Sequence, residues 1–178
     1  MKKMNLFLLC GIFLASCNNE VKKDEAVEAK AEKMTSPVDL PYTATYGSNW
    51  TTDVSDADLK TVLMSYKNWA DGNISGLLKA MGDTVTIDMT NGDHLVKTNA
   101  ELMKTWTTNR DSLSSVKIEM VAWHKMYSTD KKQTFVVTWY DETDTYKNGK
   151  VDSASYHDIN GLKDGKISYY GQFKRPKK

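Results

Sequence analysis

Cysteine is almost absent from this chain of 178 residues. Its two cysteines, Cys10 and Cys17, lie near the N-terminus, so residues 18–178 contain none. Disulfide bonds, thiol catalysis and cysteine-based metal sites are therefore excluded for the remainder of the chain. A domain without cross-links depends on a packed core, which abundant Trp, Tyr, Met and aliphatic side chains can supply.

Proline is equally scarce, since Pro37, Pro41 and Pro176 are the only three. Because proline interrupts helices and central strands, the proline-free stretch from 42 to 175 is typical of one continuous folded domain.

Charge of one sign is not in excess either, because 24 basic residues stand against 23 acidic ones. A nearly neutral chain lacks the electrostatic footprint of a nucleic-acid-binding protein. Glycine-rich phosphate loops and dinucleotide fingerprints are missing as well. No metal-binding spacing relates the three histidines, His94, His124 and His157. The sequence therefore predicts no cofactor, no metal ion and no nucleic-acid partner.

A short apolar stretch follows a positively charged start. Two lysines precede residues 6–14, which are too few to span a membrane as a helix. Residues 14–17 read Leu-Ala-Ser-Cys, and this ending resembles a bacterial lipobox. The resemblance implies a lipoprotein signal peptide over residues 1–16 and lipidation of Cys17. It predicts a membrane-anchored protein of the bacterial cell envelope.

The segment that follows Cys17 is rich in Lys, Glu and Ala. It cannot bury enough apolar surface to offset its conformational entropy. We therefore predict a flexible tether over residues 17–41 and a folded domain over residues 42–178. Asn18 takes the place of the aspartate that favours inner-membrane retention in some bacteria, which points to the outer membrane.

Apolar residues recur at helical spacing in three places. The clearest helix is predicted over residues 55–70, which open with a Ser-x-x-Asp capping pattern. Asn73 can cap a short second helix, and a Thr98-x-x-Glu101 capping box opens a third.

Strand-like alternation occupies most of the remaining sequence. Residues 84–89 alternate between polar and apolar, and the chain from residue 115 onward predicts four strands joined by tight turns. Helices followed by a strand meander indicate an α+β fold, with the helices on one face of a curved antiparallel sheet.

This order of elements, over about residues 53–173, resembles the nuclear transport factor 2-like superfamily and particularly its SnoaL-like (polyketide cyclase-like) domains. The best local marker is Tyr-His-Asp-Ile at 156–159, followed by Lys-Asp-Gly-Lys-Ile at 163–167. The resemblance implies a cystatin-like, cone-shaped mixed or antiparallel sheet, with three N-terminal helices packed on its concave face. Members use the cavity for catalysis or for binding, so the fold does not select one function.

Acid–base catalysis is one function that the resemblance implies. Isomerase-like members place a tyrosine on the first helix, an aspartate on the first strand and an acid on a late strand. By element these correspond to Tyr66 as oxyanion donor, Asp88 as base and His157 as acid. His157 and Asp158 point to opposite faces of one strand, and we favour His157 as the inward residue. Purely structural roles for Tyr66 and His157 remain the alternative.

Ligand binding is the other function, because aromatic side chains could line an apolar pocket. The predicted lining residues are Trp69, Trp106 and Trp139, which lie near the ends of elements, together with Asp158. A large aromatic core is the alternative interpretation of the same residues.

Three hypotheses follow. The leading one is a lipid-anchored module, not an enzyme, that binds a small apolar or aromatic molecule. The second is a cofactor-free isomerase or dehydratase. The third is an interaction module that forms a homodimer through the exposed face of its sheet.

Overall fold

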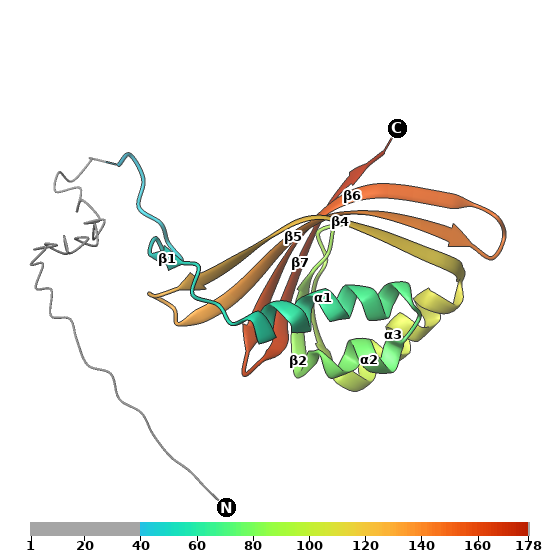
Figure 1. Ribbon diagram of the computed structural model, residues 1–178, viewed down its shortest axis with the longest axis horizontal. Coiled ribbons are helices and arrows are strands. Elements are labelled where there is room, and N and C mark those ends of the chain that lie inside the picture. The colour runs from blue at the N-terminus through green and yellow to red at the C-terminus, as the bar shows by residue number, and fades with distance from the viewer. Residues whose placement is uncertain (1–39, 178) are drawn as a thin grey trace, which may run out of the picture. The chain divides into compact units, whose positions relative to one another are not determined.

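Three helices and seven strands make up the part of the chain that this computed structural model describes, residues 40–177 (Figure 1). The helices are α1 (Asp56–Ala70), α2 (Ile74–Lys79) and α3 (Asn99–Asp111). The strands are β1 (Trp50–Thr51), β2 (Met81–Asp88), β3 (His94–Thr98), β4 (Leu113–Ser128), β5 (Gln133–Tyr146), β6 (Val151–Lys163) and β7 (Lys166–Pro176).

Side-chain caps fix the helix starts where the sequence predicts them. The Asp58 backbone N–H donates to the Ser55 hydroxyl at 3.0 Å, which starts α1. Thr98 and Glu101 form the complete capping box of α3. The predicted stop after α1 is also confirmed, because Gly72 takes a positive φ of 72° just beyond the helix.

The strands form one mixed sheet in the order β1-β4-β5-β6-β7-β2-β3. The predicted meander is confirmed, since β4 to β7 pair in succession and antiparallel. Beyond β7 the sheet continues to its other edge with β2, which pairs parallel to β7 and antiparallel to β3. The α+β class is therefore established.

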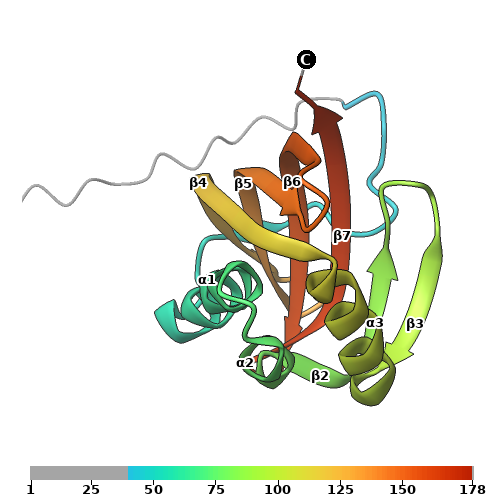
Figure 2. The same cartoon turned by 90° about the vertical axis from the view of Figure 1, so that its right-hand side faces the viewer.

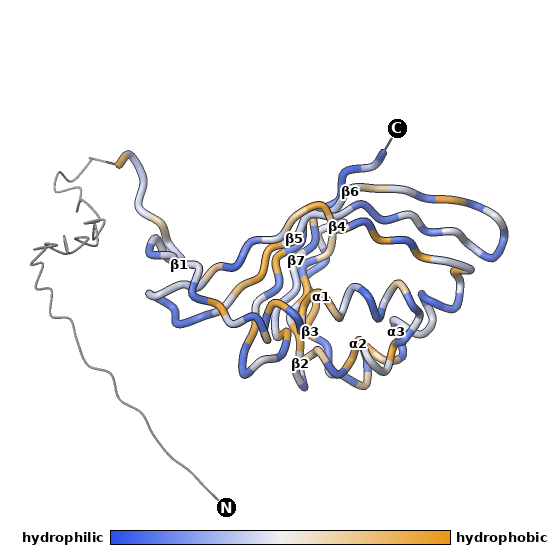
Figure 3. Tube along the Cα trace, in the orientation of Figure 1, coloured by the Kyte–Doolittle hydropathy of each residue, from blue (hydrophilic) through white to orange (hydrophobic). Residues whose placement is uncertain are grey.

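All three helices lie on one side of the sheet (Figures 1 and 2). Apolar side chains on α1, α2 and β2 meet those of the central strands there, and Val62, Val85 and Ile167 are completely buried. Figure 3 shows this concentration of hydrophobic residues in orange, whereas the turn between β5 and β6 is blue. Burial of apolar surface between these two layers is the main stabilising contribution to the domain.

The segment before α1, residues 48–51, packs on the sheet in a way that the sequence did not predict. β1 pairs with the end of β4, and the ring of Trp50 packs edge-on against Phe135 at 5.9 Å. The Asp130 carboxylate accepts hydrogen bonds from the backbone N–H groups of Ser48 and Asn49. These contacts tie the start of the domain to the β4–β5 hairpin.

Several predictions concern residues outside the described range. The signal peptide (1–16), the lipidation site Cys17 and most of the tether (17–41) belong to this group. Within residues 40–177, no helix combines the length and the apolar character needed to cross a membrane.

Candidate functional site

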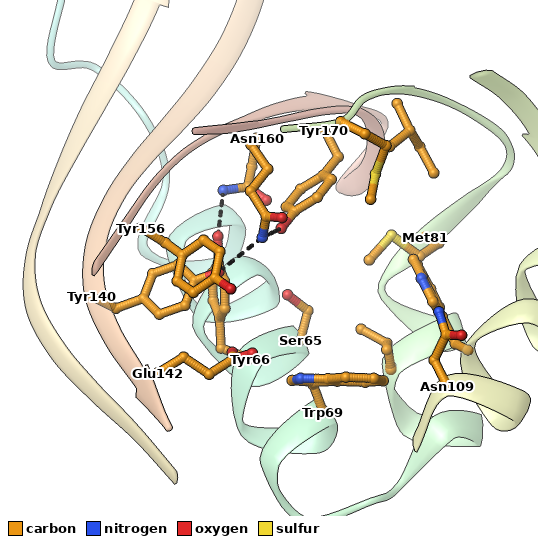
Figure 4. A pocket seen from close by; sticks show the side chains of 15 residues that line it. Ser65, Tyr66, Trp69, Met81, Asn109, Tyr140, Glu142, Tyr156, Asn160 and Tyr170 are labelled. Atoms are coloured by element: carbon orange, nitrogen blue, oxygen red, sulfur yellow. Dashed lines mark hydrogen bonds between the residues drawn. The ribbon is translucent and has the colours of Figure 1, made fainter. Parts of the chain in front are cut away.

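A cavity of about 210 Å³ lies between the helices and the sheet. Its apolar walls come from α1, α2, β2 and α3, and Figure 4 shows its labelled side chains. The apolar lining consists of Trp69, Leu77, Met81, Ile87, Met89 and Trp106. Polar groups come largely from β5, β6 and β7, so one part of the cavity is apolar and another carries hydrogen-bonding groups.

Regular spacing places these side chains. On β2, alternation turns Ile87 toward the helices and its neighbour Asp88 toward the opposite face. On α1, helical spacing sets Tyr66 and Trp69 on the side that packs against the sheet. The cavity therefore follows from the same periodicities that build the elements.

Three phenols converge on one buried carboxylate oxygen beside the cavity. Asp158 on β6 is completely buried, and its Oδ2 accepts hydrogen bonds from three tyrosine hydroxyls. The donors are Tyr66 at 2.9 Å, Tyr140 at 2.8 Å and Tyr170 at 2.9 Å. The other carboxylate oxygen, Oδ1, has no hydrogen-bond partner among the described residues.

Amide groups complete this cluster. Asn160 donates from Nδ2 to the Tyr66 hydroxyl at 3.1 Å, and Thr138 Oγ1 lies 2.8 Å from the same hydroxyl. Gln172 donates from Nε2 to the hydroxyls of Tyr140 and Tyr170. The Tyr66 hydroxyl thus has three partners, which hold the ring in place.

Burial sets the protonation of this cluster. It raises the pKa of Asp158 to about 6, although hydrogen bonds from the three phenols act in the opposite direction. Burial, and then the Asp158 charge, raises the pKa of each phenol well above 10. At neutral pH the cluster is therefore a largely ionised carboxylate held by neutral phenols.

A second acid, Glu142 on β5, lines the cavity itself (Figure 4). Burial raises its pKa to about 8, and the charges of Asp144 and Asp158 add to this effect. The Trp69 side chain, by hydrogen bonding, and the Lys174 charge oppose it. Glu142 is therefore largely protonated at neutral pH.

Four of the predicted residues meet at this site. Tyr66, Trp69 and Trp106 line the cavity, and Asp158 is buried against its tyrosines. The prediction that His157 is the inward residue of the His157–Asp158 pair is wrong, because Asp158 is the one that faces inward.

His157 and Trp139 lie on the opposite face of the sheet. Their rings stack at 4.9 Å, and Phe173 stacks on the other side of His157 at 5.6 Å. The three residues face one another across β5, β6 and β7. Neither the predicted acid nor the predicted ligand-binding Trp139 therefore reaches the cavity. Phe173 is 57% exposed, so the row is an aromatic strip on the outer surface.

Asp88 also faces away from the cavity, because it is out of phase with Ile87. Its carboxylate lies 2.6 Å from His94 Nδ1 and accepts a hydrogen bond from the Tyr169 hydroxyl at 2.8 Å. The hydrogen bond with His94, followed by that from Tyr169, lowers the pKa of Asp88. The structure thus separates Asp88 and His157 from Tyr66. Among residues 40–177, no group of acidic or histidine side chains is arranged to hold a metal ion.

Sequence reasoning did not identify Glu142, Tyr170 and Asn160 as site residues. Glu142 lies in the polar run Asp-Glu-Thr-Asp, which is typical of a solvated strand. The alternation of Asp158 and Asn160 on β6 was an available signal, because residues two apart share one face of a strand.

Comparison with solved structures supports the fold class that this architecture indicates. The chain shares the fold of nuclear transport factor 2-like and cystatin-like proteins. No family model matches the sequence, and no curated protein matches it either.

Three solved structures illustrate the likeness. A nuclear transport factor 2-like protein of unknown function from Exiguobacterium sp. is 16% identical, with 66% of this chain and 98% of that chain covered and a TM-score of 0.51. An LEH-like epoxide hydrolase from M. tuberculosis is 8% identical, with 68% and 84% covered and a TM-score of 0.56. TerC, co-crystallised with polyporic acid, is 17% identical, with 67% and 92% covered and a TM-score of 0.53.

Proposed function

We propose that the domain binds a small apolar or aromatic molecule in the cavity between its helices and its sheet. The observation that carries this proposal is the division of the cavity into an aromatic and apolar wall and a polar side. Such pockets bury the body of a ligand against apolar groups and orient it through a few hydrogen bonds. The crystal structure of TerC with polyporic acid supports ligand binding as one use of this fold.

The geometry favours binding over the acid–base alternative. A catalytic base must reach a substrate atom, but Asp158 Oδ2 is already occupied by three phenols. The Tyr66 hydroxyl, the predicted oxyanion donor, is engaged with three partners of its own. Since Asp88 and His157 lie on the other face, the predicted catalytic set does not assemble.

Two tryptophan variants test the proposal as a matched pair. Trp106→Ala removes an indole from the cavity wall, whereas Trp139→Ala removes one from the outer strip. With 2-naphthol as the probe, we expect the first variant to weaken binding about tenfold, in line with the loss of one large buried contact. We expect the second to leave the affinity unchanged.

Titration calorimetry measures both affinities, and circular dichroism establishes that both variants are folded. Loss of 2-naphthol binding in Trp139→Ala alone would place the site on the outer face and contradict the proposal. So would a wild-type domain that binds no 2-naphthol.

We also propose that Cys17 anchors the domain to the bacterial envelope. The Leu-Ala-Ser-Cys ending of an apolar leader supports this, since the cysteine of such an ending receives the lipid. Cys17→Ser in the full chain is expected to move the protein from the membrane fraction to the soluble fraction. Fractionation with immunodetection measures this, Cys10→Ser serves as the control, and equal membrane retention of both variants would rule out the anchor.

A further inference from the structure

The cavity lining combines aromatic rings with acidic groups and contains no basic side chain. Among the described residues, none of those that line the cavity is Lys, Arg or His. Glu142 is on the wall, and the buried carboxylate of Asp158 lies directly behind the tyrosines. This composition is unfavourable to an anionic ligand, because bringing a second negative charge into a low-dielectric site is costly.

We propose that the cavity selects an organic cation with apolar substituents, a quaternary or protonated amine, whose charge is attracted by the aromatic faces and balanced by Asp158 and Glu142. The inference rests on the proposed ligand-binding function and specifies the chemical class of the ligand. Alkylated ammonium groups suit such a site because they are weakly hydrated and combine a positive charge with an apolar surface.

The first argument is the orientation of the rings. Trp69 is seen edge-on along one side of the cavity in Figure 4, so one face of its indole is turned toward the space. A cation over the face of a tryptophan or tyrosine ring is attracted by the ring quadrupole. The domain already shows such a contact next to the cavity, where Lys174 Nζ lies 5.7 Å from the centre of the Tyr156 ring.

The second argument is an uncompensated negative charge. Asp158 forms no ion pair within the described part of the chain, and one of its oxygens is buried without a hydrogen-bond partner. A buried ionised carboxylate normally has a cationic partner. Here the three phenols supply hydrogen bonds to Asp158 but no opposite charge. A positively charged ligand in the adjoining cavity would supply it.

The charged groups around Glu142 lead to the same conclusion. Asp144 on its own strand and Asp158 on β6 both repel its ionised form. Lys174 on β7 attracts that form, but its ammonium is paired with Asp152 at 3.1 Å. The Trp69 side chain supplies a hydrogen bond from α1. Lys174 and Trp69 do not offset burial, so Glu142 is largely protonated at neutral pH, and a further positive charge beside it would favour its ionised form.

A choline titration tests the inference against a neutral molecule of the same shape, 3,3-dimethylbutan-1-ol. We expect the wild-type domain to bind choline about tenfold more tightly than the neutral alcohol at pH 7.5, since the two differ essentially in charge. Binding should also release protons, because a cation beside Glu142 lowers its pKa. Calorimetry in phosphate and in Tris, whose ionisation enthalpies differ, measures that release.

Glu142→Gln tests whether Glu142 is responsible for the preference for choline and for the proton release. This variant should lose most of the preference for choline and most of the proton release. Glu119→Gln serves as the control, because Glu119 is exposed and pairs with Lys117 away from the cavity. The control should behave as the wild type does.

Each result has a definite meaning. Equal affinity for choline and the neutral alcohol overturns the inference but leaves the proposed function intact. Failure to bind choline while 2-naphthol still binds does the same. Failure of all three probes overturns the inference and the proposed function together.

Discussion

Asp158→Ala is expected to destabilise the domain by about 3–5 kcal/mol, because three buried phenols lose their common acceptor and a void replaces the carboxylate. The hydroxyls of Tyr66, Tyr140 and Tyr170 all donate to one Asp158 oxygen. These tyrosines come from α1, β5 and β7, so the carboxylate joins the helical layer to two strands. Its removal therefore weakens contacts between the two layers of the fold.

Asp158→Asn separates the hydrogen bonds from the charge. Asparagine keeps an oxygen acceptor for the phenols and removes the buried negative charge, so we expect it to cost about 1–2 kcal/mol, less than alanine does. Urea unfolding monitored by tryptophan fluorescence measures both variants at pH 7. Equal losses in the two variants would show that the charge, and not the hydrogen bonding, holds the cluster together.

The helices and the meander of the last four strands could be predicted because local signals marked them. Ser55 and Thr98 cap the helices that they were expected to cap, and the Asn-Gly turns at 91–92 and 148–149 contain glycines with positive φ. Such signals depend only on a few neighbouring residues. The two-residue β1 and the parallel pairing of β2 with β7 depend on distant segments, and no local pattern announced them.

Which side chains of the late strands point inward could not be predicted either, for a different reason. On a half-buried strand, hydrophobicity normally marks the inner face. On β6 the inner face carries Asp158 and Asn160, whereas Ile159 shares the outer face with His157. Polarity is therefore reversed at the residues that form the site, as expected where a sequence serves function as well as packing.

Glu142 also makes the stability of the domain depend on pH. Its pKa is about 8 in the folded domain and near 4.5 in an exposed glutamate. A carboxyl group whose folded pKa is raised contributes stability that is fully present below pH 4.5 and is lost as the pH rises through about 8. Asp158 behaves in the same way, but its contribution is already lost as the pH rises through about 6.

The interval between pH 6 and pH 8 lies above the pKa of Asp158 and reaches that of Glu142, so Glu142 is expected to contribute most of the change there. Carboxyl groups with lowered pKa values, such as those of Asp88, Asp130 and Asp141, titrate at more acidic pH and contribute nothing to the change in this interval. The free energy of unfolding of the wild-type domain should fall across it. The decrease should be about 1–2 kcal/mol, well below the full value of the pKa shift, because water in the open cavity screens the charge.

Glu142→Gln removes the titrating group and keeps its shape, so this variant should have a nearly constant free energy of unfolding between pH 6 and pH 8. At pH 8 it should be more stable than the wild type, because the wild type must then ionise a partly buried acid. Urea unfolding at half-unit pH intervals measures both proteins, with Glu119→Gln as the exposed control. A parallel decrease in wild type and Glu142→Gln would show that another group causes it. The cavity wall would then have no protonated acid that could release a proton when a ligand binds.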